Sequence, residues 1–97
     1  MRIISRRTLR EFGLLHPDAK LVLDAWWSAT NRGRWTSPSE LLASNRNVRL
    51  LRDGRVVFKL RGNQYRLVVK VHYTRSIVYV RFIGTHAEYD RIDANTI

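Results

Sequence analysis

The sequence predicts a single α+β domain, in which N-terminal helices pack on one face of a small antiparallel sheet and a short helix follows the sheet. The first half has apolar residues at helical spacing, whereas the second half alternates apolar and polar residues between turn signals. The chain has 97 residues, the length of one domain. We therefore expect residues 1–97 to form one unit with a thin core and a shallow surface site.

Residues 1–45 have the pattern of helices joined by short turns. A short strand over residues 2–4 comes first, and Ser5 is the expected N-cap of a helix that ends near Pro17, because the residue before a proline avoids the helical region. Pro17 suits the first position of a second helix, which we expect to end at residues 31–33. Its apolar residues follow the spacing i, i+3, i+4, i+7 and are Val22, Ala25, Trp26 and Ala29.

Two capping boxes, in which Ser or Thr precedes Glu by three residues, predict two further helices. Residues 37–40 form the first box, and Pro38 suits the first position of the short helix that it opens. Residues 85–88 form the second box, which opens a short last helix running toward Asp93. Gly84 is expected to end the strand before it.

The segment between the two boxes has the alternation of an antiparallel meander with one apolar and one cationic face. Strands are expected at 56–61, 64–73 and 77–83, with turns at 53–54, 62–63 and 74–76. The apolar face is expected to contain Val56, Phe58, Leu60, Tyr65, Leu67, Val69, Val71 and Tyr73. The cationic face is expected to contain Lys59, Arg61, Arg66, Lys70 and His72.

The net charge of +10 comes from 18 Lys and Arg residues against 8 Asp and Glu residues, and all but three of the cations are arginines. Residues 46–82 contain ten of the cations and a single acid, Asp53. Such clustering favours a polyanion, and nucleic acid is the most common one. The alternative is an arginine-rich composition with a solvated basic face. An anionic membrane is disfavoured because the basic segment has a sheet pattern rather than that of an amphipathic helix.

Several classes of site are excluded by composition. The chain has no cysteine, so it has no disulfide, thiol nucleophile or thiolate metal site. No apolar run is long enough for a membrane span and the N-terminus lacks the apolar core of a signal peptide, so we expect a cytoplasmic protein. The three histidines (His16, His72 and His86) and the scattered acids lack metal-ligand spacing, so we expect neither a metal nor a cofactor.

The cationic strand face is the first candidate site. Lys59, Arg61 and Arg66 lie on neighbouring predicted strands, at distances that allow two or three side chains to bind one phosphate. Such a clamp would stabilise the pentacoordinate phosphorane formed during RNA cleavage. The alternative is an ordinary solvated sheet face.

The predicted last helix is the second candidate site. Its free N–H groups favour an anion, His86 is able to move a proton at neutral pH, and Tyr89 is able to donate a proton or stack on a base. The alternative is that His86 is a bystander, and Glu88 is better explained as the capping residue. If the protein cleaves RNA, the nucleophile should be the ribose 2′-hydroxyl, since the chain then needs to supply only a base, an acid and a cationic clamp.

Two tryptophans fall outside the expected helical stripe. Trp26 lies on that stripe and is expected in the core. Trp27 and Trp35 are candidate anchors for a protein partner, because tryptophan is enriched in binding hot spots. Packing against the neighbouring helix is the alternative.

Two segments carry a resemblance to a known family. Residues 62–69, GNQYRLVV, and residues 78–90, VYVRFIGTHAEYD, resemble the HigB toxin family of the RelE/ParE superfamily. Residues 17–20 and the hairpin at 53–58 extend the resemblance, which covers essentially the whole chain. The combination of the two motifs at this spacing is specific.

This resemblance implies a RelE-like fold and a bacterial type II toxin that cleaves mRNA on translating ribosomes. In RelE-like toxins, a strand arginine in a Tyr-Arg-Leu context helps to bind the scissile phosphate, and Arg66 occupies that place. The run at residues 59–61 matches a Lys-Leu-Arg run on the preceding strand. The chain departs from RelE where His86 replaces a second arginine and where Tyr89 precedes the place of the catalytic tyrosine. The division of acid and base roles between these two residues is therefore open.

The resulting hypothesis is a metal-independent endoribonuclease without a cofactor. The candidate catalytic residues are Arg66, Lys59, His86 and Tyr89. The candidate RNA-binding residues are Arg61, Lys70, Arg81 and Arg55. The expected partners are the ribosome, mRNA and a HigA-like helix-turn-helix antitoxin that covers part of the 46–82 surface or displaces the last helix. The alternatives are a non-catalytic, ParE-like gyrase inhibitor and a basic RNA-binding module, but the retained cations together with His86 argue against the gyrase branch.

Overall fold

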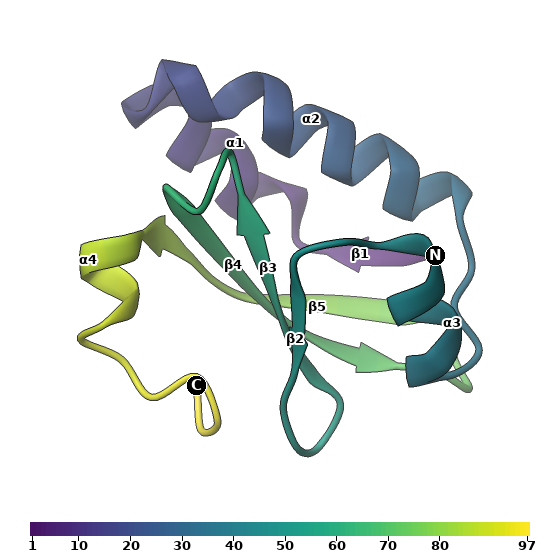
Figure 1. The fold of residues 1–97 in the computed structure, drawn as a ribbon. Helices are drawn as coiled ribbons and strands as arrows, with labels where there is room; N and C mark the ends of the chain where they lie inside the picture. The colour runs from purple at the N-terminus through teal and green to yellow at the C-terminus, as the bar shows by residue number, and fades with distance from the viewer.

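A computed structural model describes residues 1–97 as an α+β fold with an open, mixed five-stranded sheet (Figure 1). The strand order in the sheet is β1-β5-β4-β3-β2. The elements are β1 (Arg2–Ile4), α1 (Arg6–Leu15), α2 (Pro17–Arg32), α3 (Pro38–Ser44), β2 (Val48–Leu50), β3 (Arg55–Leu60), β4 (Tyr65–His72), β5 (Ile77–Thr85) and α4 (His86–Tyr89). No helix has the length and apolar character that crossing a bilayer requires. The predicted fold class is confirmed.

The sheet is built on the predicted meander. Strands β2 to β5 pair in antiparallel fashion, whereas β1 pairs with β5 in parallel and makes the sheet mixed rather than wholly antiparallel. Strand β5 also continues past the predicted break at Gly84, because Gly84 pairs with Arg66 and Thr85 pairs with Tyr65. Helix α4 therefore follows β5 with no residue between them.

The predicted boundaries of α1 and α2 agree with the structure, but the predicted stripe of α2 is only half right, because Trp26 is buried and Val22 packs against the core. The buried residues of α2 are Ala19, Leu23, Trp26 and Thr30, whereas Ala25 and Ala29 are exposed. Both stripes satisfy helical spacing. The helix is rotated so that Leu23, which has more apolar surface than Ala25 or Ala29, is buried in the core.

The capping predictions for α1 and α3 have different outcomes. Ser5 occupies the N-cap position of α1 with extended backbone, but its side chain makes no capping hydrogen bond. Ser37 caps α3 by accepting a hydrogen bond from the Glu40 N–H at 3.2 Å. The Glu40 carboxylate turns to the N–H and hydroxyl of Thr36, so only half of the predicted capping box is formed.

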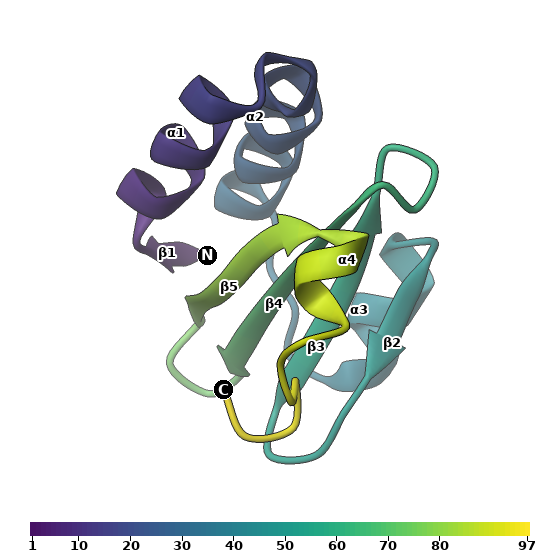
Figure 2. The ribbon, with the colours of Figure 1, turned by 90° about the vertical axis from the view of Figure 1, so that its left-hand side faces the viewer.

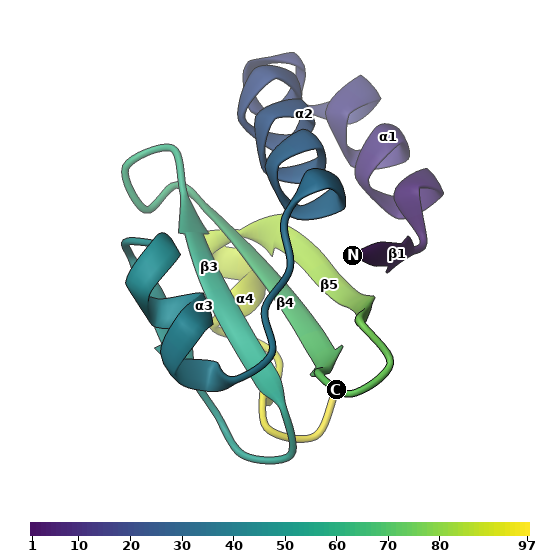
Figure 3. The same ribbon diagram turned by 90° about the vertical axis from the view of Figure 1, so that its right-hand side faces the viewer.

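The main core lies between the helices and the face of the sheet that carries the predicted apolar residues. Leu67 and Val69 are fully buried at its centre, below Leu9 and Leu23 of the helical layer. Burying side chains of this size contributes about 1.5–3 kcal/mol each. Figure 3 shows α1 and α2 above this face and α3 in front of β3 on the same side.

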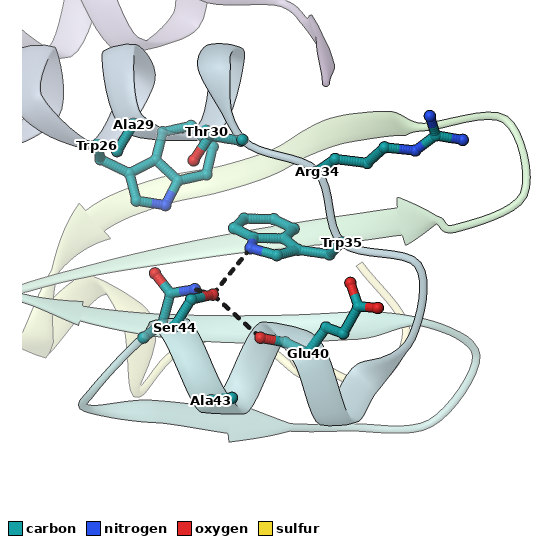
Figure 4. Close-up of a pocket in the computed structure, with 10 residues that line it drawn as sticks. Trp26, Ala29, Thr30, Arg34, Trp35, Glu40, Ala43 and Ser44 are labelled. Carbon is teal, nitrogen blue, oxygen red and sulfur yellow. Dashed lines mark hydrogen bonds between the residues drawn. The ribbon is translucent and has the colours of Figure 1, made fainter.

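Two of the three tryptophans belong to this core. Figure 4 shows Trp26 and Trp35 facing a cavity of about 450 Å³ between α2 and α3. Trp35 stacks against Phe58 with ring centroids 6.0 Å apart, and its Nε1 donates to Ser44 Oγ at 3.2 Å. The half-buried Trp27 lies under the Arg6 guanidinium, 3.9 Å from the ring centroid. Trp35 is therefore explained by packing within the core. The ring of Trp27 is already in contact with the guanidinium of Arg6.

The opposite face of the sheet is not the open cationic face that alternation predicts. Val57 and Val68 pair across β3 and β4 and are fully buried on this face. They form a second, small core with Ala94, and the segment after α4 folds back over them (Figure 2). The prediction was wrong because the two valines make the centre of this face apolar and residues 90–97 cover it.

Candidate nucleic-acid interface

The register of β3, β4 and β5 produces a cationic row at one end of the second face. Lys59 pairs with Arg66, and Arg66 pairs with Gly84. Directly opposed residues of an antiparallel pair have Cβ atoms about 4.5–5.5 Å apart, so the two cationic side chains start within reach of one phosphate. Helix α4 lies over the same end of the sheet (Figure 2). The predicted adjacency of Lys59 and Arg66 is present.

Arg66 is a buried cation without an anionic partner. The residue as a whole is only 8% exposed, and its Nε is buried with no hydrogen-bond partner. The five ion pairs of the protein include neither Arg66 nor Lys59. The Arg66 Cζ lies 5.1 Å from the centroid of the Tyr89 ring, which partly compensates the charge. Because burying an unpaired charge is costly, we expect an anion that binds this guanidinium to stabilise it.

Gly84 is the residue of β5 next to Arg66 in the row, and it has no side chain. A Cβ at this position would lie 2.5 Å from Phe82 Cζ and 3.2 Å from Glu88 Cβ. The space is used by the Phe82 ring, which packs against Tyr89 with centroids 6.5 Å apart. Gly84 is therefore a close-approach residue within a strand, not the strand break that the sequence predicts.

Helix α4 begins at the predicted capping box. Thr85 Oγ1 accepts from the Glu88 N–H at 3.2 Å, and Glu88 Oε1 accepts from the Thr85 N–H at 2.8 Å. The hydrogen bond from the Thr85 backbone holds the pKa of the Glu88 carboxyl below its ordinary value. The capping role predicted for Glu88 is confirmed.

Two other predictions for this helix are wrong. It ends at Tyr89 after one turn and does not continue toward Asp93. Two of its N-terminal N–H groups are already bonded, because the His86 N–H donates to Gln64 O at 3.0 Å and the Glu88 N–H is capped. The cations of the sheet, rather than the helix end, are left to bind an anion here.

The turn of α4 gives His86 and Tyr89 different surroundings. The His86 side chain is half exposed, and its Nδ1 lies 3.5 Å from Asp90 Oδ2. Tyr89 is half-buried, with its ring against Phe82 and the Arg66 guanidinium. The structure therefore joins Tyr89 to Arg66 directly and places His86 on the exposed side of the same helix.

Alternation predicts that Arg61 lies on the same face of the sheet as Lys59, but the structure places it elsewhere. Strand β3 ends at Leu60, and Arg61 has a positive φ of 49° in the turn. Its guanidinium contacts the Gln64 side chain and lies 3.3 Å from Asp18 Oδ2 on α2. The left-handed backbone of the turn interrupts the period of two and directs the side chain toward the helical layer.

Asp18 is a polar residue of this region that the sequence did not single out. The Tyr65 hydroxyl donates to Asp18 Oδ1 at 2.6 Å. This bond holds the pKa of the Asp18 carboxyl below its ordinary value, with a further contribution from the charge of Arg61, and it raises the pKa of Tyr65. Tyr65 was predicted to be buried, and burial of a hydroxyl was the available signal that it needs a partner.

We expect the substitution Asp18→Asn to destabilise the fold at pH 7 more than at pH 3. The native pKa of Asp18 is lowered, so its ionised form contributes stability above the unfolded pKa of about 3.9, and this is lost as pH falls through the native value. Urea unfolding at both pH values measures the difference. Glu11→Gln, in an exposed ion pair with Arg7, is the control and should change little. An equal deficit for Asp18→Asn at both pH values would contradict the linkage.

The remaining candidate RNA-binding residues lie at the other end of the second face. Arg55 pairs with Lys70 in the register, beyond the row of buried valines. Arg55 Nε donates to the main-chain oxygen of Ile97 at 3.0 Å, and Arg81 Nε, at the β5 bulge, lies 3.5 Å from the same oxygen. The structure does not bring these residues together with Arg66, and two of them hold the C-terminal segment in place. No group of three or more His, Asp or Glu side chains is placed to hold a metal ion.

Comparison with known proteins relates the chain to one family of toxins. Residues 19–92 match the family model of the HigB toxin, described as the RelE-like toxic component of a toxin–antitoxin system. The chain is 31% identical over 93 residues to the mRNA interferase toxin HigB of Escherichia coli K12, covering 93% of this chain and 88% of that protein. The same values hold for the mRNA interferase HigB of Shigella flexneri. A 24% identity over 94 residues, 95% of this chain and 91% of the relative, relates it to the mRNA interferase HigB of E. coli O6:H1. The chain therefore belongs to the HigB toxin family, the RelE-like toxic components of toxin–antitoxin systems.

Proposed function

We propose that this chain is an mRNA interferase, a metal-independent endoribonuclease that cleaves mRNA bound to the ribosome in the bacterial cytoplasm. The observation that carries the proposal is Arg66, a buried residue whose guanidinium forms no ion pair and lies beside Lys59 and Tyr89. The names of the relatives, which are mRNA interferases, support the same activity. A shallow surface with an unpaired cation suits one phosphate of a polymer better than it suits a buried metabolite.

Arg66 and Lys59 bind the scissile phosphate in this mechanism. The planar guanidinium is able to donate two parallel hydrogen bonds to the non-bridging oxygens, and the lysine adds a point charge. Arg66 is held by its neighbours in the sheet and by the Tyr89 ring, so it needs little reorganisation. These donors stabilise the extra negative charge of the phosphorane more than that of the ground state.

The nucleophile is the ribose 2′-hydroxyl of the substrate. A base removes its proton, the 2′-oxygen attacks phosphorus, the bond from phosphorus to the 5′-oxygen breaks, and an acid protonates that oxygen. The products are a 2′,3′-cyclic phosphate and a free 5′-hydroxyl. His86 and Tyr89 are the two groups at this end of the sheet that we assign to the proton transfers.

The other cations serve RNA binding in this proposal. Arg61 lies on the turn beyond the Lys59–Arg66 row, and Lys70 lies on the far side of the buried valines. In this proposal Lys70 contacts a phosphate that flanks the scissile one, and Arg61 does so only if its contacts with Asp18 and Gln64 are given up. Arg55 and Arg81 are able to join them only if their contacts with Ile97 are given up.

The test is a cleavage assay with programmed ribosomes. The enzyme should leave mRNA fragments with 2′,3′-cyclic phosphate and 5′-hydroxyl ends, identified by whether they are substrates for end-specific kinase and phosphatase treatment. Intact mRNA that remains bound to the protein would identify a binding module instead. Supercoiling by gyrase, measured in parallel, should be unaffected by the protein.

The family implies a cognate antitoxin, and we propose a HigA-like helix-turn-helix protein as this partner. A chain of net charge +10 needs an acidic or neutralising surface in a stable complex. Part of the 46–82 surface is already covered by the protein's own C-terminal segment. An antitoxin therefore has to displace that segment or to bind elsewhere.

We expect cleavage to survive an excess of EDTA, because the proposed mechanism needs only a base, an acid and fixed cations. The measurement compares the cleavage rate with and without EDTA, and sedimentation of the ribosomes in the same samples separates substrate loss from toxin loss. Activity that returns only when one divalent ion is added back to the toxin itself would refute this mechanism.

A further inference from the structure

The cavity between α2 and α3 lies outside the proposed catalytic surface. It has a volume of about 450 Å³ and lies on the helical face of the sheet, at the end of α2 that is farthest from α4 (Figures 1 and 4). The Lys59–Arg66 row is on the opposite face, at the end of the sheet where α4 lies (Figure 2). The cavity is therefore a separate place at which the protein is able to bind a ligand.

Two indole rings form the apolar part of the cavity wall. Trp26 comes from α2 and Trp35 from the segment between α2 and α3, and the two residues are only 7% and 6% exposed. Both rings pack against Phe58 of β3, with centroids 5.4 Å and 6.0 Å away from the Phe58 centroid, so their orientations are fixed. The buried Thr30, one turn after Trp26, lines the same cavity. The wall is thus formed before any ligand binds.

The indole N–H of Trp26 is a buried donor without an acceptor. No hydrogen bond satisfies Trp26 Nε1, and Figure 4 shows this nitrogen turned toward the space between α2 and α3. Trp35 Nε1, in contrast, donates to Ser44 Oγ at 3.2 Å. Because an unpaired buried donor is destabilising, the Trp26 N–H favours an occupant that brings an acceptor into the cavity.

An acceptor and a cation complete the polar groups of the cavity. The amide nitrogen of Asn45 donates to Leu41 O at 2.9 Å, so the amide oxygen remains as an acceptor. Arg34 lines the cavity and takes part in none of the five ion pairs. Its exposed side chain extends outward from the buried wall (Figure 4). Glu40 is the one acid that lines the cavity, and its carboxylate is bound by the N–H and hydroxyl of Thr36.

These groups together define the chemistry of the ligand. An aliphatic or phenyl side chain would cover the indoles but leave the Trp26 N–H without an acceptor. Inorganic phosphate would bind Arg34 but leave the indoles uncovered. A nucleobase meets both needs inside the cavity, because its flat face stacks on an aromatic ring and its ring nitrogens and carbonyls accept hydrogen bonds. The phosphate of the same nucleotide would then meet Arg34 outside the cavity.

We propose that the cavity between α2 and α3 binds a single nucleotide. The base lies against Trp26 and Trp35 and accepts a hydrogen bond from Trp26 Nε1. An amino or ring N–H group of the base donates to Asn45 Oδ1, and the phosphate binds Arg34. The nucleotide is either free in solution or an unstacked nucleotide of a single-stranded RNA, and the net charge of +10 favours the approach of both.

The test follows the indole N–H signals of the three tryptophans by NMR. Trp26→Phe and Trp27→Phe assign the signals by their loss. Titration of the wild-type protein with adenosine 5′-monophosphate (AMP) should shift the Trp26 signal until it saturates, because that N–H gains an acceptor. The Trp27 signal should stay in place, since Trp27 does not line the cavity. An unchanged Trp26 signal at about 10 mM AMP, well above a weak Kd of about 1 mM, would overturn the proposal.

Partial ligands separate the base from the phosphate. Adenosine should shift the Trp26 signal, whereas ribose 5-phosphate should not. Arg34→Gln should weaken AMP binding about tenfold and leave adenosine binding unchanged. Arg32→Gln is the matched control, because Arg32 is exposed at the end of α2 and does not line the cavity. Equal losses in the two variants, or an equal shift with ribose 5-phosphate, would show general attraction by charge and contradict a nucleotide site.

A single-stranded oligonucleotide distinguishes the two sources of the nucleotide. A 2′-O-methyl oligoadenylate of about six nucleotides has no 2′-hydroxyl to attack phosphorus, so it reports binding alone. Saturation of the Trp26 shift at a lower nucleotide concentration than with AMP would identify an RNA strand as the ligand, and equal or weaker binding would identify the free nucleotide. Both results support the nucleotide site, and neither depends on cleavage at the Lys59–Arg66 row.

Discussion

Replacing Arg66 by alanine should slow single-turnover cleavage of mRNA by roughly 10²–10³-fold, the loss expected when a preorganised donor to the transition state is removed. The reason is structural. Arg66 is buried without an anionic partner, beside Lys59 in the sheet. The measurement is made at saturating toxin, so that weaker binding does not enter the rate.

Arg75→Ala is the control for charge, because Arg75 is exposed in the turn between β4 and β5. It should cleave at close to the wild-type rate. Since Arg66 is buried, its substitution also needs a control for packing. Arg66→Met keeps a long side chain against the Tyr89 ring and should be as slow as Arg66→Ala, with a thermal melt of each variant for comparison. Equal rates for Arg66→Ala and Arg75→Ala would refute the phosphate clamp.

The proton-transfer assignments make the second large prediction. His86→Gln and Tyr89→Phe should each slow single-turnover cleavage by about 10²–10⁴-fold, the usual contribution of a positioned acid or base. Tyr89→Phe retains the ring that packs on Phe82 and Arg66 and removes only the hydroxyl. The pair of substitutions therefore tests proton transfer with little change in packing.

His72→Gln is the matched control for His86→Gln. His72 is exposed at the end of β4, where its Nδ1 accepts from the Arg75 N–H at 3.2 Å, and its loss should leave the rate unchanged. A wild-type rate for Tyr89→Phe together with a slow Tyr89→Ala would show that Tyr89 stacks on a base and moves no proton. A wild-type rate for His86→Gln would remove His86 from the mechanism.

Much of the candidate site was available from local sequence patterns. The period of two along β3 and β4, with a short turn between them, was enough to place Lys59 beside Arg66. The capping box at residues 85–88 was enough to start α4 and to explain Glu88, because both of its hydrogen bonds are local. Features determined by neighbours within a few residues can be predicted from sequence.

Tertiary packing decided the features that the sequence misplaced. The alternation of the sequence puts Arg61 on the face of Lys59, but the left-handed backbone of the turn directs its side chain toward Asp18. The rotation of α2 followed from which of two stripes, both with helical spacing, packs into the core. Gly84 was interpreted as a break because glycine weakens strands, whereas the structure keeps it in β5, where Phe82 and Glu88 occupy the space that a side chain would need.

The sequence by itself determined the α+β class, the meander, the positive charge and the family resemblance, since each is written in composition, period or short motifs. Only the tertiary structure showed that Val57 and Val68 are covered by the C-terminal segment, and that Arg66 is buried beside Tyr89 rather than solvated. Whether a residue on a strand face is exposed depends on which distant segment packs there, and that depends on the summed burial of apolar surface across the whole chain. A local pattern contains no information on that sum.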